Sequence, residues 1–137
     1  MKEQEEARKL ILTHGTNSPF EIAAKRKIEV LIEDLGKQIW GYYSNVNRIP
    51  IIHINNRLSR DLANYTCGHE LGHSILHPSI NTPFLRSNTF FSVDKIERQA
   101  HRLAIHLLIG LNRPEQGETK QQFLHRCGIP HEFHIFY

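Results

Sequence analysis

The pattern His-Glu-Leu-Gly-His at residues 69–73 is the part of this sequence best suited to chemistry. If the segment is helical, His69 and His73 lie one turn apart on the same face, so both imidazoles can reach one zinc ion. Glu70 between them can stay off the metal and act as a base on water. Because so short a pattern also arises by chance in a chain rich in His and Glu, the surrounding residues must support it.

The surrounding residues have the spacing of a helix with apolar side chains on more than one side. Ser59 is a suitable N-cap, the helical spacing runs to His77, and Pro78 fits the end of the helix. A helix buried on both sides should not carry two histidines and a glutamate unless another group satisfies them. We therefore interpret His69 and His73 as metal ligands; the alternative is a solvated or merely hydrogen-bonded cluster.

A third ligand is needed, because a catalytic zinc site takes three protein ligands and keeps one position for water. A second long helix is predicted at about 92–109, and it carries one broad apolar sector. Glu97 falls inside this sector, His101 at its border and His106 on the opposite face. A carboxylate that points into a core is costly unless it is paired or binds a metal, which favours Glu97 as the third ligand. A salt bridge from Glu97 to an arginine is the alternative.

The other polar candidates are weaker. A donor should stabilise the oxyanion that forms when water attacks a carbonyl, and the sequence does not choose among four residues: His77, His101, Tyr42 and Tyr43. His77 and His101 can instead contact a metal ligand and support it from behind, and His77 can equally be a surface residue at the helix end. Cys67 is expected to pack, and Gly72 to allow a close approach beside the metal. The remaining histidines are interpreted as solvated or hydrogen-bonded: His14, His53, His106, His125, His131 and His134.

A small sheet is predicted ahead of the two long helices. Residues 28–33, 38–43 and 49–54 are rich in β-branched and aromatic side chains. Turn-like segments at 34–37 and 44–47 separate them. Three consecutive strands with short turns predict an antiparallel meander. The predicted fold class is α+β, with a small antiparallel three-stranded sheet packed with several helices and a zincin-like HExxH active-site helix.

Further helices are predicted from the start of the chain to about residue 14, at 19–25 behind the N-cap Ser18, and at 119–127 behind the N-cap Thr119. No internal repeat or Gly/Ser linker interrupts the chain. We therefore expect a single metallopeptidase domain over 1–137, with its core at about 19–110 and a C-terminal helical tail at 118–137.

Composition limits the classes of protein. The 137 residues are 39% hydrophobic and 23% charged, which is typical of a globular chain and excludes collagen-like and disordered classes. No apolar stretch approaches the roughly 18 residues of a membrane span, and no signal peptide is recognised, so we expect a cytoplasmic protein without a membrane partner. Its two cysteines are expected to be free thiols. The 17 basic residues are scattered among 14 acids, so no direct nucleic-acid partner is expected.

Three stretches follow one another in a specific order: Ile51-Ile-His-Ile-Asn55, Thr66-Cys-Gly-His-Glu-Leu-Gly-His-Ser-Ile-Leu-His77 and Glu97-Arg-Gln-Ala-His-Arg-Leu-Ala104. They resemble the ImmA/IrrE family of zinc metallopeptidases, whose members carry a strand ending in Ile-x-Ile-Asn, then H-E-x-G-H-x-x-x-H, then E-x-x-A-x-x-x-A. The resemblance covers about 19–109. It implies that His69, His73 and Glu97 bind Zn²⁺ in a gluzincin-like site and that Glu70 is the catalytic acid/base. Gly68 stands where Ala is usual, and His101 where Asn is common.

The resemblance also implies a function. Family members are bacterial, phage or integrative-element proteins that relieve repression by cleaving a helix-turn-helix repressor. We therefore expect a zinc-dependent endopeptidase in which zinc activates water and Glu70 passes the proton to the leaving amine. The alternative is a metal-containing anti-repressor that inactivates the repressor by binding without proteolysis. DNA binding through residues 119–130, which faintly resemble half of a helix-turn-helix, would need a basic face that the segment lacks.

Overall fold

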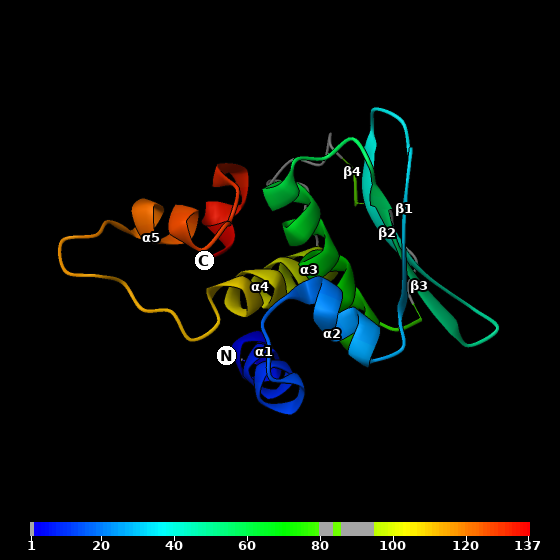
Figure 1. Cartoon of the computed structure of the whole chain (residues 1–137), viewed down its shortest axis with the longest axis horizontal. Helices are drawn as coiled ribbons and strands as arrows, with labels where there is room; N and C mark the ends of the chain where they lie inside the picture. Colours follow the sequence, from blue (N-terminus) through cyan, green and yellow to red (C-terminus); the bar gives the residue numbers. More distant parts are fainter. Residues whose placement is uncertain (1, 80–83, 86–94) are drawn as a thin grey trace.

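Four strands form one small sheet, and the helices lie on one side of it (Figure 1). The computed structural model describes residues 2–79, 84–85 and 95–137. The strands are β1 (Glu29–Glu33), β2 (Ile39–Val46), β3 (Ile49–Asn55) and β4 (Phe84–Leu85). The helices are α1 (Lys2–His14), α2 (Pro19–Lys25), α3 (Arg60–Leu76), α4 (Lys95–Ile109) and α5 (Lys120–Arg126), followed by the 3-10 helix η1 (His131–Phe136). The predicted α+β class is confirmed.

The sheet is mixed, so the predicted antiparallel meander is wrong for its first strand. The strand order is β1-β3-β2-β4: β2 pairs antiparallel with β3, whereas β1 lies parallel to β3 on its other side. The physical reason lies in residues 34–38, which carry the chain across the end of β3 instead of turning it back beside β1. The side-chain amide of Asn55 holds this crossing, because its Nδ2 donates to the carbonyls of Gly36 and Ile39, both at 2.8 Å.

The hairpin between β2 and β3 is tighter than predicted. Strand β2 continues to Val46, through part of the segment that was expected to be a turn. Only Asn47 and Arg48 make the turn, and both have a left-handed backbone, with φ of 54° and 64°. Two consecutive residues with positive φ match the right-handed twist of the paired strands. Ser44 is therefore a strand residue, and its side chain alternates in direction with that of Tyr43.

The predicted helix signals correspond to real helix ends. The Oγ atoms of Ser18 and Ser59 accept hydrogen bonds from the third residue of α2 and α3, and Thr119 forms a reciprocal capping box at α5. Helix α4 is described from Lys95; the predicted first turn at 92–94 lies outside the described residues. Each cap satisfies a backbone N–H that the first turn of a helix leaves without a partner.

Helix α3 lies between the sheet and α4, and its residues 65–73 are all buried. Small residues face each other where α3 meets α4. A Cβ atom at Gly68 would lie 3.4 Å from the Cβ of Ala104, and one at Gly72 would lie 3.3 Å from the Cα of Ala100. The two helix axes therefore approach closely, as predicted for Gly72, and the residues next to these contacts in the chain come together.

The end of the chain folds back onto α3 and α4. A second cluster of buried hydrophobic residues joins these helices to α5 and η1. Its members from the tail are Phe123, Leu124, Ile129 and Phe133, and Tyr65 is their main partner on α3. The ring of Phe133 stacks on that of Tyr65, with centroids 4.1 Å apart. The tail thus covers Tyr65 on α3 and the apolar residues of α4 next to it, and Phe133 also contacts Trp40 of β2.

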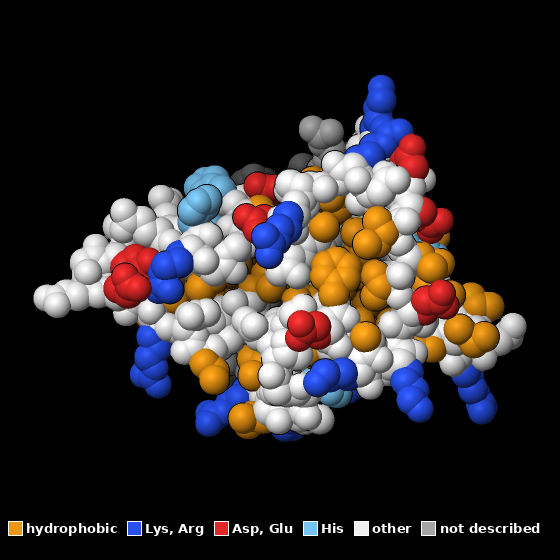
Figure 2. All heavy atoms as spheres, in the orientation of Figure 1, with side chains coloured by type: hydrophobic (Ala, Val, Ile, Leu, Met, Phe, Trp, Pro, Cys, Tyr) orange, Lys and Arg blue, Asp and Glu red, His pale blue; other side chains and the backbone are white. Residues whose placement is uncertain are grey.

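The cysteines, the basic side chains and the helix lengths were the subject of further expectations from composition. Cys67 and Cys127 are both free thiols, and Cys67 is buried in the core, as predicted. On the face drawn in Figure 2, the Lys and Arg side chains are scattered mainly around the margin. Within the described ranges, no helix has both the length and the apolar character needed to cross a bilayer.

Candidate metal centre

Side chains of α3 and α4 converge where the two helices cross. Nε2 of His69 lies 3.0 Å from Oε2 of Glu97, and Nε2 of His73 lies 2.9 Å from Oε1 of the same carboxylate. All three residues are buried. Glu97 precedes Ala100 by one turn, and His73 adjoins Gly72, so the close helix contact explains why they meet. The structure brings together the three residues that were predicted as ligands.

Burial and mutual contact set the charges of these groups. Burial lowers the pKa of His69 to about 4, so its imidazole is neutral and offers a lone pair. Burial alone would raise the pKa of Glu97, but its close contacts with Nε2 of His69 and Nε2 of His73 hold it well below its usual range. Two imidazoles and one carboxylate are the donor set of a catalytic zinc site with two histidines and one glutamate. The residues present therefore fit a zinc ion.

Glu70 lies beside these donors on α3. One ligand atom from each of His69, Glu70 and His73 lies within 4.8 Å of the others. In the described part of the chain, neither carboxylate oxygen of Glu70 has a hydrogen-bond partner. Burial, and then the negative charge of Glu97, raises the pKa of Glu70 well above its usual range. A carboxyl group in such surroundings keeps its proton to a higher pH than an exposed one does, which suits a general acid/base.

His77 contacts His73 on the side away from Glu97. The Nδ1 atoms of the two rings are 3.2 Å apart, and Nε2 of His77 lies 2.8 Å from Oε1 of Gln99 on α4. A supporting position was among the alternatives predicted for His77. Gln99 was not predicted, because it contacts the centre only through His77, and only the crossing of the two helices brings these residues together.

His101 lies on the other side of His69, with ring centroids 4.3 Å apart. Its Nδ1 is 2.7 Å from the hydroxyl oxygen of Tyr65, and its ring stacks on that of Phe136 at 4.1 Å. Ligand atoms of His69, Glu97 and His101 also lie within 4.8 Å of one another. His101 is thus buried at the centre rather than at the border of the apolar face, because the tail covers it.

The two tyrosine candidates lie in other surroundings. Tyr43 is part of the hydrophobic core with Ile52 and Ile54. Tyr42 stacks on His53, with ring centroids 4.0 Å apart. Of the four predicted oxyanion donors, His77 and His101 are the two that the structure places in contact with a proposed ligand.

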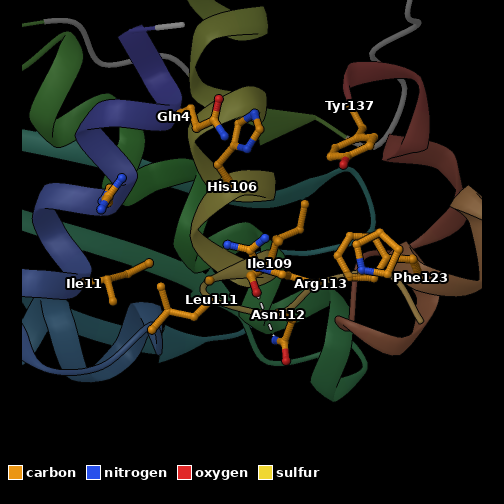
Figure 3. Close-up of a pocket in the computed structure, with 12 residues that line it drawn as sticks. Gln4, Ile11, His106, Ile109, Leu111, Asn112, Arg113, Phe123 and Tyr137 are labelled. Carbon is orange, nitrogen blue, oxygen red and sulfur yellow. Dashed lines mark hydrogen bonds between the residues drawn. The ribbon is translucent and has the colours of Figure 1, made fainter. Parts of the chain in front are cut away.

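A separate cavity of about 370 Å³ lies at the C-terminal end of α4 (Figure 3). It is lined by residues of α1, by the end of α4 with the residues after it, by Phe123 of α5 and by Tyr137. His106 points into this cavity, which agrees with its predicted place on the helix face opposite Glu97. The proposed ligands are not among the lining residues, so this cavity and the metal centre are distinct.

Comparison with known proteins assigns a family to this arrangement. Residues 23–134, which include both helices of the centre, match the family described as IrrE N-terminal-like domain. No solved structure matches.

Two relatives are similar to this chain over most of its length. The chain is 41% identical over 101 residues to immunity region protein 2 of Bacillus phage phi105, covering 74% of this chain and 64% of that protein. It thus spans less than two thirds of that relative's length. It is 34% identical over 129 residues to Metallopeptidase ImmA of Bacillus subtilis (strain 168), covering 88% of this chain and 75% of that protein. The chain therefore belongs to the ImmA/IrrE family of metallopeptidases.

Proposed function

We propose that this chain is a zinc-dependent endopeptidase that cleaves a helix-turn-helix repressor and so relieves repression in a phage or mobile element. One observation carries the proposal: a buried carboxylate, Glu97, lies within 3.0 Å of Nε2 of both histidines, with Glu70 beside them. Two nitrogen donors and one oxygen donor leave a fourth position for water on a tetrahedral zinc ion.

In this proposal His69, His73 and Glu97 hold the ion, and Glu70 moves the proton. When bound, zinc supplies Lewis-acid activation of water and of the scissile carbonyl. Glu70 takes up the proton of the attacking water at one carboxylate oxygen and delivers it to the nitrogen of the leaving amine. Its dry surroundings, which raise its pKa, suit the second of these steps, because a carboxyl group that holds its proton can donate it.

Gln99 and His77 orient His73 in this proposal. The side-chain oxygen of Gln99 can only accept a hydrogen bond, so Nε2 of a neutral His77 carries its proton and its Nδ1 is an acceptor. Nδ1–H of His73 then donates to His77, which leaves the lone pair on Nε2 of His73 directed at the metal position. Such outer contacts fix both the ring orientation and the tautomer of a metal-binding histidine.

A protein substrate from an immunity system is supported by the relatives. One comes from a phage immunity region and another is named as a metallopeptidase. The competing function, an anti-repressor that acts by binding alone, would need the metal-binding residues for its fold but would not need proton transfer by Glu70. Exchange of Glu70 for glutamine therefore separates the two functions.

The test mixes the purified, zinc-loaded chain with the repressor encoded next to its gene. We expect about one zinc ion per chain and a discrete repressor fragment from wild type and from the control Glu5→Gln, an exposed carboxylate on α1. Glu70→Gln should keep its zinc and yield no fragment. Cleavage by Glu70→Gln at the wild-type rate would overturn the assignment. Repressor inactivation without a fragment would replace the protease with the binding protein.

A further inference from the structure

Three polar side chains from neighbouring strands form a line across the sheet, outside the metal centre. Oγ of Ser44 on β2 lies 3.1 Å from Nε2 of His53 on β3. Nδ1 of the same ring lies 3.0 Å from Oε1 of Glu33 on β1. The two ring nitrogens thus contact a hydroxyl on one side and a carboxylate on the other. This is the order of contacts that serine hydrolases use on unrelated folds.

These side chains lie on the sheet face that points away from α3. Side chains alternate along a strand, and the neighbours Tyr43, Ile52 and Ile54 are buried in the core on the helix side. Ser44 and His53 therefore project to the opposite face, which the described helices leave open (Figure 1). The sheet therefore lies between this line of three residues and the metal centre on α3 and α4.

The contacts fix the tautomer and the position of His53. A carboxylate accepts from Nδ1–H, so the lone pair of a neutral ring is on Nε2 and faces the hydroxyl of Ser44. Tyr42 lies opposite His53 on β2 and stacks on its ring at 4.0 Å with an interplanar angle of 10°. Leu31 lies opposite it on β1. The His53 side chain is only 11% exposed, so the base is shielded, and Ser44 is partly exposed.

We propose that Ser44 is an activated nucleophile and that this line of residues is a second, metal-independent site that hydrolyses small aryl esters. Oγ of Ser44 attacks the ester carbonyl while its proton moves to Nε2 of His53. The bond from Oγ to the acyl carbon forms, the bond to the aryl oxygen breaks, and the proton passes to the leaving aryloxide. Water, deprotonated by Nε2, then releases the acid and returns a proton to Ser44.

The location of the site limits its substrates. A flat sheet surface holds a substrate less firmly than a cleft, so we expect small acyl groups with a good leaving group. Glu33 is 48% exposed, which makes its orienting contact with His53 weaker than a buried one. The expected activity is consequently modest, and it should depend on all three residues.

The test uses the full chain with a metal chelator present, so that the metal centre does not contribute. We expect hydrolysis of p-nitrophenyl acetate, and a fluorophosphonate probe should label the chain at one site, found at Ser44 by peptide mapping. Ser44→Ala should abolish the label and lower the hydrolysis rate at least about 10-fold, and Glu33→Gln should lower both rates about 10-fold. Circular dichroism checks that each variant is folded.

Two matched variants serve as controls. Glu29→Gln changes an exposed carboxylate on the same face of β1, and Ser79→Ala changes an exposed serine. Both should react like wild type. A label on another residue, a Ser44→Ala variant that retains the rate, or equal rates for Glu33→Gln and Glu29→Gln would overturn the proposal and leave these contacts as a purely structural cover for the sheet.

Discussion

Alanine should stabilise the fold at Gly68 but not at Gly72, although these residues lie one turn apart on α3 and both face α4. A Cβ at Gly68 would meet the Cβ of Ala104 at 3.4 Å and the Cγ of Pro19 at 3.5 Å, which are ordinary van der Waals contacts. A Cβ at Gly72 would lie 3.3 Å from both Cα and the carbonyl oxygen of Ala100. Backbone atoms cannot rotate away, so this second methyl group must push the helices apart.

The magnitudes follow from these contacts. Alanine in place of glycine inside a helix gains about 1 kcal/mol, and burying the new methyl group at Gly68 gains up to about 0.8 kcal/mol more. Gly68→Ala should therefore raise the free energy of unfolding by about 1–2 kcal/mol. At Gly72 the same helix gain is opposed by an overpacking cost of about 1–3 kcal/mol. Gly72→Ala should thus range from neutral to about 2 kcal/mol less stable.

Urea unfolding of the metal-free chain, followed by circular dichroism, measures both changes. Zinc titration against a chelating dye adds a second measurement. Because Glu97 lies one turn before Ala100, Gly72→Ala should also weaken zinc binding, and Gly68→Ala should leave it unchanged. Equal stabilisation by the two substitutions, or weaker zinc binding in Gly68→Ala alone, would refute the reasoning that the α4 backbone limits the approach of the helices.

Three further predictions concern the centre and the sheet. Glu97→Gln should lower zinc affinity more than about 100-fold, and His101→Gln only about 10–100-fold, which is the effect expected of a residue that supports a ligand. Zinc competition with the chelating dye measures both affinities, and a larger loss in His101→Gln would make His101 the third ligand. In the metal-free chain the pKa of Glu70 is raised above its ordinary 4.5, so the folded state keeps a proton that the unfolded state loses. The free energy of unfolding of wild type should therefore fall by up to about 1.4 kcal/mol per pH unit as the pH rises above 4.5, and that of Glu70→Gln should lack this slope. If the urea midpoints of the two proteins change in parallel between pH 5 and pH 8, the prediction is contradicted. Asn55→Ala removes four hydrogen bonds around the end of β3 and should lower the free energy of unfolding by about 2–4 kcal/mol. Thermal unfolding measures this change. A loss of less than about 0.5 kcal/mol would show that residues 34–38 keep their path without Asn55.

The metal-centre residues could be predicted because their relation is mostly local. Helical spacing alone places His69 and His73 on one face. The apolar sector of α4 then isolates Glu97 as a carboxylate directed into the core, where it is found. The N-caps Ser59 and Thr119 could be recognised for the same reason, since a cap depends on residues two or three positions away.

The parts that could not be predicted depend on contacts between distant residues. The pattern of a strand shows which side chains share a face, but it does not show which strand lies beside it. The place of β1 depends on Asn55, whose partners lie 16 to 20 residues earlier in the chain. Gln99 and Phe136 likewise reach the centre only through the packing of one helix or segment on another.

The residue types at the α3–α4 contact suit metal binding better than they suit hydrophobic packing. Glycines and alanines give this contact little hydrophobic area, and the buried polar groups beside it cost stability: Glu70 has no hydrogen-bond partner among the described residues, and the pKa of His69 is lowered by burial. Larger apolar residues would join two helices more strongly than a buried ionic cluster does. A zinc ion that binds only the folded chain would offset this cost, because its binding free energy adds to the free energy of unfolding. The same small residues that bury little apolar area at this contact also bring Glu97 within reach of both histidines. Hydrophobic packing is therefore weakest where the three donors meet.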